Sequence, residues 1–247
     1  DTNPGFGASY SDNCGKIIAG NTSDYAHIHG KALIAAGHPF CTCSKETFCQ
    51  DSTLADSFWT VDLVCGKQLT TVTPDGLEKY QVFPYELQNA IRRFTSKGGN
   101  MIVSGACIAT DIWDEVYPVT FEKAFRDSSK KFAREVLGYK WTRNYGSRTG
   151  ELMFAESERA CTEEGEAGSF HNTINSVCYS VEAPDAIAPA SRKGSTFLYY
   201  KDTRYAAGIC YEGVGYKTVC LGFPIETLKE KKSIDNIISI TLEFFNK

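Results

Sequence analysis

The sequence feature that most constrains the fold is an alternation of short apolar runs with longer amphipathic segments. Apolar runs of strand length cover 16–20, 60–65 and 100–105, and a glycine closes or follows each run. The segments 85–94 and 121–137 place apolar residues at helical spacing. Strands that alternate with helices predict a mostly parallel sheet flanked by helices. We therefore expect a three-layer α/β fold.

Shorter signals lie between these runs. The sequence predicts a helix over 29–36 and a further strand over 39–43. The segment 67–80 contains Pro74-Asp75-Gly76, whose composition is typical of a turn, so we expect a loop there.

The last third of the sequence predicts an antiparallel extension of the sheet. Short aromatic and β-branched runs cover 197–201, 205–211 and 217–221, and a glycine-containing hairpin turn separates the last two. The acidic stretch 163–168 is expected to be a flexible part of a polar insertion over about 156–176. Ser233 is expected to cap a final helix. The side chains of that helix expected to face inward are Ile234, Ile237, Ile238, Thr241, Leu242 and Phe245.

Composition and charge exclude several classes of protein. The 247 residues are 42% hydrophobic and 23% charged, which is globular composition, and we expect one domain over 1–247 with a lead-in over about 1–15. The net charge of −4 argues against a nucleic-acid partner, because a phosphate-binding surface needs excess Lys and Arg. No run of about 20 apolar residues predicts a membrane span. The chain starts at Asp1 without an apolar signal region, so we expect a mature or trimmed product.

The spacing of the ten cysteines does not predict a structural metal site. No C-x2-C pair occurs, so structural zinc is not expected, and we expect no other metal site and no cofactor. Cys41 and Cys43 form a C-x-C pair that would face one side of the expected strand at 39–43. Buried thiols of this kind usually act as small apolar side chains.

Cys107 is the sharpest candidate for chemistry. The run 100–105 leads directly into Gly105-Ala106-Cys107-Ile108-Ala109, a small-residue pattern similar to a strand–turn–helix nucleophile elbow. A thiol near a helix N-terminus has a lowered pKa, which would favour the reactive thiolate. The alternative is that Gly105 and Ala106 only let the turn pack and that Cys107 fills space.

A cysteine nucleophile needs an imidazole held by a third group. The histidines are His27, His29, His38 and His171. His29 follows the first expected strand, and we therefore expect it at the same sheet edge as Cys107. The alternative is a histidine at a helix start that bonds to the backbone.

The residues after the elbow offer two further kinds of site. Asp111, Asp114 and Glu115 could hold a cation or act in acid–base chemistry, or simply favour a helix start. The aromatic side chains expected to be exposed near them, and to suit a sugar ligand, are Trp113, Tyr117, Trp141 and Tyr145.

A ligand is expected where the carboxyl ends of the parallel strands meet, because helix N-termini and polar loops gather at that edge. Lys67 would add a positive charge suited to an acidic sugar. The candidate ligand-binding residues are Asn21, Asp24, His29, Lys67, Gln68 and Asp111. The alternative is that these side chains hold the loops together.

Several segments together resemble one known group of proteins. The resemblance runs from about residue 16 to the C-terminus. Its segments are Gly20-Asn21-Thr22-Ser23-Asp24-Tyr25, 28–32, 61–68, 83–84, 87–91, 98–100, 103–106 and Leu221-Gly222-Phe223-Pro224-Ile225-Glu226-Thr227. The pattern is similar to the C-terminal region of secreted Bacteroidetes proteins labelled "xanthan lyase". The resemblance implies a class I glutamine-amidotransferase-like, flavodoxin-like fold and a secreted, periplasmic or cell-surface location.

The same resemblance implies a test for glutaminase chemistry. Working glutamine amidotransferases have a G-x-C-x-G elbow, to which the segment around Cys107 is similar, and a late strand that ends in a His-Pro-Glu segment. Here that strand ends Phe223-Pro224-Ile225-Glu226, so the glutamate matches but no histidine precedes it. The triad is incomplete, and the sequence leaves open whether the chain is an enzyme.

Three functions remain open from the sequence. The first is a ligand-binding or accessory module, without glutaminase activity, of a carbohydrate-processing surface protein. Its expected partners are an acidic polysaccharide or sugar and the other modules of a longer protein. The second is a polysaccharide lyase or hydrolase that uses Cys107 and His29 where the strands end. Glu226 is a separate candidate catalytic residue. The third is a structural domain that joins other modules.

Overall fold

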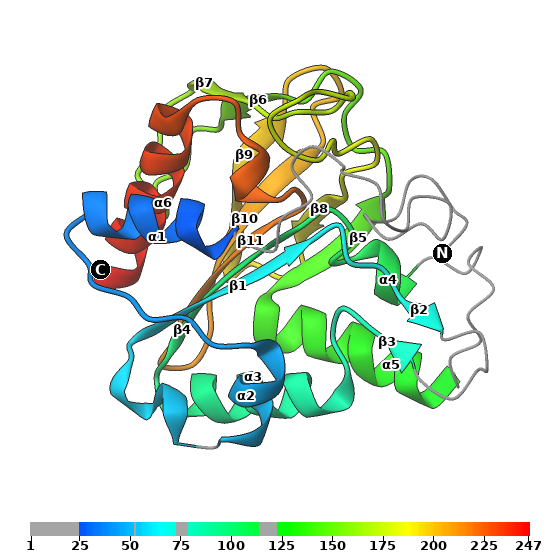
Figure 1. Ribbon diagram of the computed structural model, residues 1–247, viewed down its shortest axis with the longest axis vertical. Coiled ribbons are helices and arrows are strands. Elements are labelled where there is room, and N and C mark those ends of the chain that lie inside the picture. Colours follow the sequence, from blue (N-terminus) through cyan, green and yellow to red (C-terminus); the bar gives the residue numbers. More distant parts are fainter. Residues whose placement is uncertain (1–24, 52, 73–78, 114–122) are drawn as a thin grey trace.

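The computed structural model describes residues 25–51, 53–72, 79–113 and 123–247, and its centre is a seven-stranded sheet (Figure 1). In spatial order the strands are β1 (Thr60–Gly66), β4 (Asn100–Gly105), β11 (Lys217–Leu221), β10 (Ala206–Glu212), β9 (Gly194–Tyr200), β6 (Glu151–Phe154) and β7 (Gly165–Ser169). Two small sheets pair β2 (Thr71–Val72) with β3 (Lys79–Tyr80) and β5 (Tyr139–Arg143) with β8 (Ala186–Pro189).

The sheet has a parallel part and an antiparallel part. Strands β1, β4 and β11 run parallel, with Val103 opposite both Leu63 and Cys220. Strands β10, β9, β6 and β7 then follow in antiparallel pairs. This arrangement confirms the α/β class with an antiparallel extension. The strand predicted at 16–20 lies outside the described residues.

Helices cover both faces of the sheet, because successive side chains of a strand point to opposite faces. Ile102 of β4 packs in the core on the side of α1 (Ala26–Ala35) and α6 (Lys231–Asn246). Its neighbours Met101 and Val103 pack in the core on the side of α3 (Tyr85–Ser96) and α5 (Lys123–Phe132). Figure 1 shows α1 and α6 together on one side of the sheet and α3 and α5 on the other.

The remaining elements are short. They are α2 (Lys45–Gln50), α4 (Thr110–Trp113), the 3-10 turns η2 (Leu54–Ser57) and η4 (Ile225–Thr227), and the π-helical turn η3 (Ala133–Leu137). The turn η3 continues α5, so the long helix predicted over 121–137 ends in a different helical form, while residues 121 and 122 are outside the described part.

Two predictions for the first half of the chain are wrong. No strand forms at 39–43, and the thiols of Cys41 and Cys43 are exposed rather than buried. Instead, the ring of Phe40 packs directly against Gly30. A Cβ atom at Gly30 would lie only 2.1 Å from this ring. The expected loop over 67–80 contains the paired strands β2 and β3.

Two further predictions fail in the second half. The stretch 163–168 is not an irregular insertion, because most of it belongs to β7, which pairs with β6. Ser233 does not cap α6, since the helix begins two residues earlier and Glu230 is the cap residue. Ser233 packs against Gly168 instead, where a Cβ would lie 2.2 Å from its hydroxyl oxygen. The inward-facing set of α6 is confirmed, since Ile234, Ile237, Ile238, Thr241, Leu242 and Phe245 are all buried.

Candidate functional site

The carboxyl ends of the three parallel strands meet at one edge of the sheet, which we call the carboxyl edge. Strand β1 ends at Gly66, β4 at Gly105 and β11 at Leu221. The loops that leave these strands are joined, because the amide of Ala106 donates to the carbonyl of Gly66 at 2.8 Å. The expected ligand-binding loops are therefore neighbours, although Asn21 and Asp24 lie outside the described residues.

His29 lies beside this edge and is held between two carboxylates. Its Nδ1 is 2.7 Å from Asp62 Oδ2 and its Nε2 is 3.2 Å from Glu226 Oε2. Helix α1 supplies the imidazole, β1 supplies Asp62, and η4 supplies Glu226. The side chains are only 3%, 11% and 0% exposed, respectively. The sequence predicted His29 and Glu226 separately, and the structure brings them together.

The two carboxylates keep the imidazole charged. Burial by itself lowers the pKa of His29, but the charges and hydrogen bonds of Asp62 and Glu226 outweigh it and raise the pKa to about 10. Both ring nitrogens then carry a proton and donate to a carboxylate. An imidazolium in this state has no free lone pair and cannot act as a general base.

Tyr179 extends this cluster toward the surface. Its hydroxyl donates to Glu226 Oε1 at 2.7 Å, and its ring packs edge-on against Tyr25 at a centroid distance of 5.0 Å. Burial, and then the charge of Glu226, raise the pKa of Tyr179 well above its usual range, so the hydroxyl keeps its proton. Only Asp62 Oδ1 is left buried without a hydrogen-bond partner among the described residues of this cluster.

Sequence reasoning missed Asp62 and Tyr179. Asp62 had a detectable signal, because it is the one charged residue in the apolar run from Val61 to Cys65. An ionisable side chain in a buried strand needs a partner, so the run itself indicates an ion pair. Tyr179 gave no such signal, since it is far in sequence from Glu226.

Cys107 lies in the turn after β4 but packs inside the core beside α1 and α6. Burial, and to a lesser degree the carboxylates of Asp185 and Asp111, raise the pKa of its thiol well above the usual value. A thiol that stays protonated is a poor nucleophile. Because both nitrogens of His29 are already bound by carboxylates, the arrangement does not supply Cys107 with a base.

The amides of the elbow turn bind a carboxylate of the chain itself. Ala109 and Thr110 donate their backbone N–H groups to Asp185 Oδ2 at 2.6 and 2.9 Å, and the Thr110 hydroxyl donates to Oδ1 at 2.5 Å. Burial raises the pKa of Asp185 to about 7 although these bonds lower it. The donors that could have formed an anion-binding hole are thus occupied by Asp185, which the sequence did not identify.

Two predicted ligand-binding residues hold loops together. Asp111 accepts the backbone N–H groups of Thr70 and Val82 at 2.6 and 3.1 Å. Gln68 donates to the carbonyl of Gln81 at 2.7 Å and accepts from Lys45 at 3.3 Å. Both side chains therefore connect the end of β1 to the segment before α3, as the structural alternative for these residues expected.

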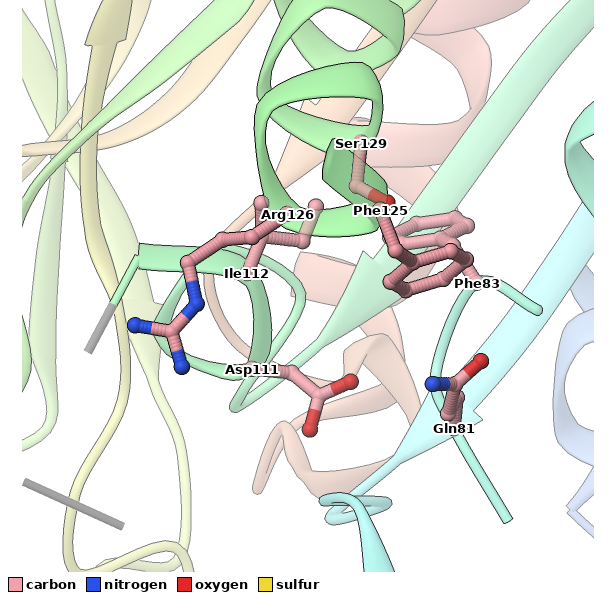
Figure 2. A pocket seen from close by; sticks show the side chains of 7 residues that line it. All are labelled: Gln81, Phe83, Asp111, Ile112, Phe125, Arg126 and Ser129. Atoms are coloured by element: carbon pink, nitrogen blue, oxygen red, sulfur yellow. The ribbon is translucent and has the colours of Figure 1, made fainter. Parts of the chain in front are cut away.

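Asp111 also lines a small pocket between this loop and α5. Figure 2 shows the side chains that line it, of which Phe125, Arg126 and Ser129 come from α5 and Asp111 and Ile112 from α4. The lining residues are Gln81, Phe83, Asp111, Ile112, Phe125, Arg126 and Ser129. Since Asp111 already accepts two backbone hydrogen bonds, most of its capacity is used within the protein.

The aromatic side chains expected near the elbow do not form an exposed platform. Trp113 and Trp141 are half-buried and pack against the core, while Tyr145 is exposed and Tyr117 lies outside the described residues. Trp141 lies away from the seven-stranded sheet, because β5 carries it into a separate two-stranded sheet.

Lys67 is the predicted ligand-binding residue that remains at the surface of the carboxyl edge. Its ammonium is 2.7 Å from Glu182 Oε2, and Glu182 also accepts a hydrogen bond from the hydroxyl of Ser180. Lys67 is 15% exposed and Glu182 is 46% exposed. Ser180 follows Tyr179 directly, so this ion pair lies beside the buried cluster of His29.

In the ranges that the structure describes, no three His, Cys, Asp or Glu side chains are grouped so as to hold a metal ion. Within the same ranges, no helix has the length and apolar character that crossing a membrane requires.

Comparison with known proteins gives matches among solved structures. No protein-family model matches the chain, and no curated protein matches it. Among solved structures, the exo-beta-1,4-mannosidase Op5Man5 from Opitutaceae bacterium strain TAV5 is similar with a TM-score of 0.48 and 10% sequence identity. The match covers 89% of this chain and 31% of the mannosidase chain, so this chain spans less than a third of that protein's length. A similarity of this size says nothing about activity.

Proposed function

We propose that the chain is a ligand-binding or accessory module of a secreted, carbohydrate-processing surface protein and that it does not hydrolyse glutamine. The observation that supports the absence of glutamine hydrolysis is the state of His29. Both its nitrogens are bound by carboxylates at 2.7 and 3.2 Å, while Cys107 is buried in the core. Hydrolysis of glutamine by a cysteine nucleophile needs a thiolate and an imidazole with a free nitrogen, and this arrangement supplies neither.

The proposal that the chain binds a ligand is supported by the residues at the carboxyl edge. Parallel strands direct their carboxyl ends, where ligands of such sheets bind, toward this edge. Lys67 provides a cation there, and Tyr179 and Ser180 provide hydroxyl groups beside it. A cation with neighbouring hydroxyls suits an acidic sugar better than an apolar molecule. The resemblance to proteins labelled "xanthan lyase" supports the same class of ligand and a location outside the cytoplasm.

The lyase or hydrolase alternative that uses Cys107 and His29 receives no support from this geometry. A base for proton abstraction must be unprotonated near neutral pH. His29 has a pKa of about 10 and Tyr179 keeps its proton, so neither meets that requirement.

Glutamine hydrolysis can be tested directly by measuring ammonia release. We expect no ammonia release above that of the Cys107→Ala variant. We also expect Cys107 to react with iodoacetamide far more slowly than Cys41 and Cys43, which are exposed and serve as controls in the same sample. Glutamine turnover that disappears in Cys107→Ala would overturn the proposal.

A further inference from the structure

The ammonium of Lys67 is already bound by a carboxylate of the same chain. Glu182 Oε2 lies 2.7 Å from Lys67 Nζ, and Ser180 donates its hydroxyl to the other oxygen of Glu182. Burial opposes ionisation of Glu182, but the hydrogen bonds from Lys67 and Ser180 outweigh it and lower the pKa of this carboxyl. A cation and a hydroxyl at the carboxyl edge therefore hold a carboxylate.

Lys67 differs from the other lysines in ion pairs of the described residues. It is 15% exposed, whereas Lys97, Lys201 and Lys231 are 51%, 41% and 67% exposed. Most of its side chain is buried, and its ammonium binds the half-exposed carboxylate of Glu182. This fixed position distinguishes Lys67 from a mobile surface charge.

The turn that carries Lys67 lies close to the buried cluster of His29. Gly66 precedes Lys67 and has φ +54, and a Cβ at this glycine would meet Tyr179 Oη at 3.5 Å and Glu226 Oε1 at 3.9 Å. These are ordinary contact distances, so the Tyr179 hydroxyl lies next to the turn that carries Lys67.

We propose that Lys67 and Ser180 form a carboxylate-binding site and that Glu182 occupies it until the carboxylate of an acidic sugar displaces it. This inference rests on the proposed function and names the ligand group that the site recognises. Glu182 is 46% exposed, so its side chain can turn into water when it leaves Lys67. The backbone beside it stays in place, because Val181 is buried and its amide donates to the carbonyl of His171 at 2.8 Å.

Displacement of Glu182 has a small energetic cost. An ion pair with one half-exposed partner shifts an equilibrium by a factor of about 1 to 5, because water solvates the released carboxylate. A ligand carboxylate that gains the same two donors can compensate for this factor. Glu182 therefore weakens binding without preventing it.

The Glu182→Gln variant tests the inference in the absence of ligand. The amide keeps the size of the side chain but removes the charge that holds the Lys67 ammonium. We expect acetylation of Lys67 by a water-soluble N-hydroxysuccinimide ester, followed by peptide mass spectrometry, to become about 2- to 5-fold faster. Glu164→Gln removes a similar exposed charge that pairs with Arg204, and it should leave Lys67 labelling unchanged.

The second arm measures binding by titration calorimetry with a uronic-acid tetrasaccharide and with the same tetrasaccharide after reduction of its carboxyl groups. We expect Glu182→Gln to bind the acidic probe about 2- to 5-fold more tightly than the unmodified chain, and Glu164→Gln to bind it with unchanged affinity. The reduced probe should bind at least tenfold more weakly to both. Melting temperatures confirm that each variant is folded.

The outcomes separate the inference from the proposed function. Binding of the acidic probe that is unchanged or weaker in Glu182→Gln overturns the inference and leaves a ligand-binding module. Equal binding of the reduced probe overturns carboxylate recognition and still supports a sugar ligand. Failure of the acidic probe to bind any variant, Glu182→Gln included, overturns the inference together with the ligand-binding function.

Discussion

Two glutamates lie near the same edge of the sheet and have opposite surroundings. Glu226 is fully buried and accepts hydrogen bonds from His29 and Tyr179, whereas Glu182 is 46% exposed and accepts from Lys67 and Ser180. Each carboxylate has one cationic and one hydroxyl donor, so the chemistry of the two sites is similar. The difference is access to water, which decides whether a charge pair holds the fold together or remains available to a ligand.

Burial changes the energetic meaning of such a pair. Removing one member of a buried ion pair typically costs about 3–5 kcal/mol, because the remaining charge is left without compensation. Removing one member of an exposed pair costs about 0–1 kcal/mol. The buried cluster of His29 should therefore govern stability, and the Lys67–Glu182 pair should govern binding.

The largest expected effect is that of His29→Ala. This change leaves Asp62 and Glu226 buried without their shared cation, and we expect the free energy of unfolding to fall by about 3–5 kcal/mol. Urea denaturation measures it. Lys31→Ala, two positions away on the exposed side of α1, serves as the control and should change the free energy by no more than about 0.5 kcal/mol. A similarly small loss in the free energy of unfolding in both variants would show that the buried cluster of His29 does not govern stability.

The second prediction concerns pH. The pKa of His29 is raised from 6.5 to about 10 in the folded chain, so its stabilising contribution is fully present below pH 6.5 and is lost as the pH rises toward 10. Between pH 7 and 8.5 the free energy of unfolding should fall with a slope that approaches about 1.4 kcal/mol per pH unit.

The chosen pH window separates His29 from other groups. Asp185, whose pKa is raised to about 7, contributes mainly below this window and at its lower end. The thiols of Cys65 and Cys178, whose pKa values are raised from 9.0 to about 12 and 11, contribute mainly above it, because the unfolded chain loses these protons near pH 9. Urea titrations at several pH values within the window measure the slope. A free energy that is constant or rises between pH 7 and 8.5 would show that His29 is not the shared cation.

Asp111→Ala has a smaller expected effect. The substitution leaves the backbone N–H groups of Thr70 and Val82 without their acceptor, and we expect a loss of about 1–3 kcal/mol. Thermal unfolding should show a fall in the melting temperature, while affinity for an acidic oligosaccharide should stay the same. Lost affinity with an unchanged melting temperature would place Asp111 in the binding site instead.

The sequence predicted the parts of the fold that depend on local periodicity. Strand β4 coincides with the predicted run 100–105, β11 coincides with 217–221, and the buried face of α6 matches the predicted residues. The prediction of a strand over 39–43 was wrong for a physical reason. A short apolar run can also form a loop in which one aromatic ring packs against the protein. The edge strand β7 was missed because Glu163-Glu164-Gly165-Glu166 has neither alternation nor β-branched residues.

The candidate site was only partly predictable. The order of the strands placed His29 and Glu226 near one edge, but it paired the imidazole with Cys107 rather than with Asp62. The true partners lie 33 and 197 residues from His29 along the chain, and no local pattern encodes such contacts. Asp185 and Glu182 were missed for the same reason, since their partners are 75 and 115 residues away.

Calorimetric titration of a uronic-acid oligosaccharide into the unmodified chain and into Lys67→Ala tests the central claim most directly. We predict measurable binding to the unmodified chain and loss of binding in Lys67→Ala. The melting temperature of the variant should stay within about 2–4 °C of the original, because the carboxylate left without its partner, Glu182, is 46% exposed and stays solvated. A melting temperature lowered well beyond that range would instead make Lys67 a structural residue. Failure of the unmodified chain to bind an acidic oligosaccharide would refute the binding role of this edge.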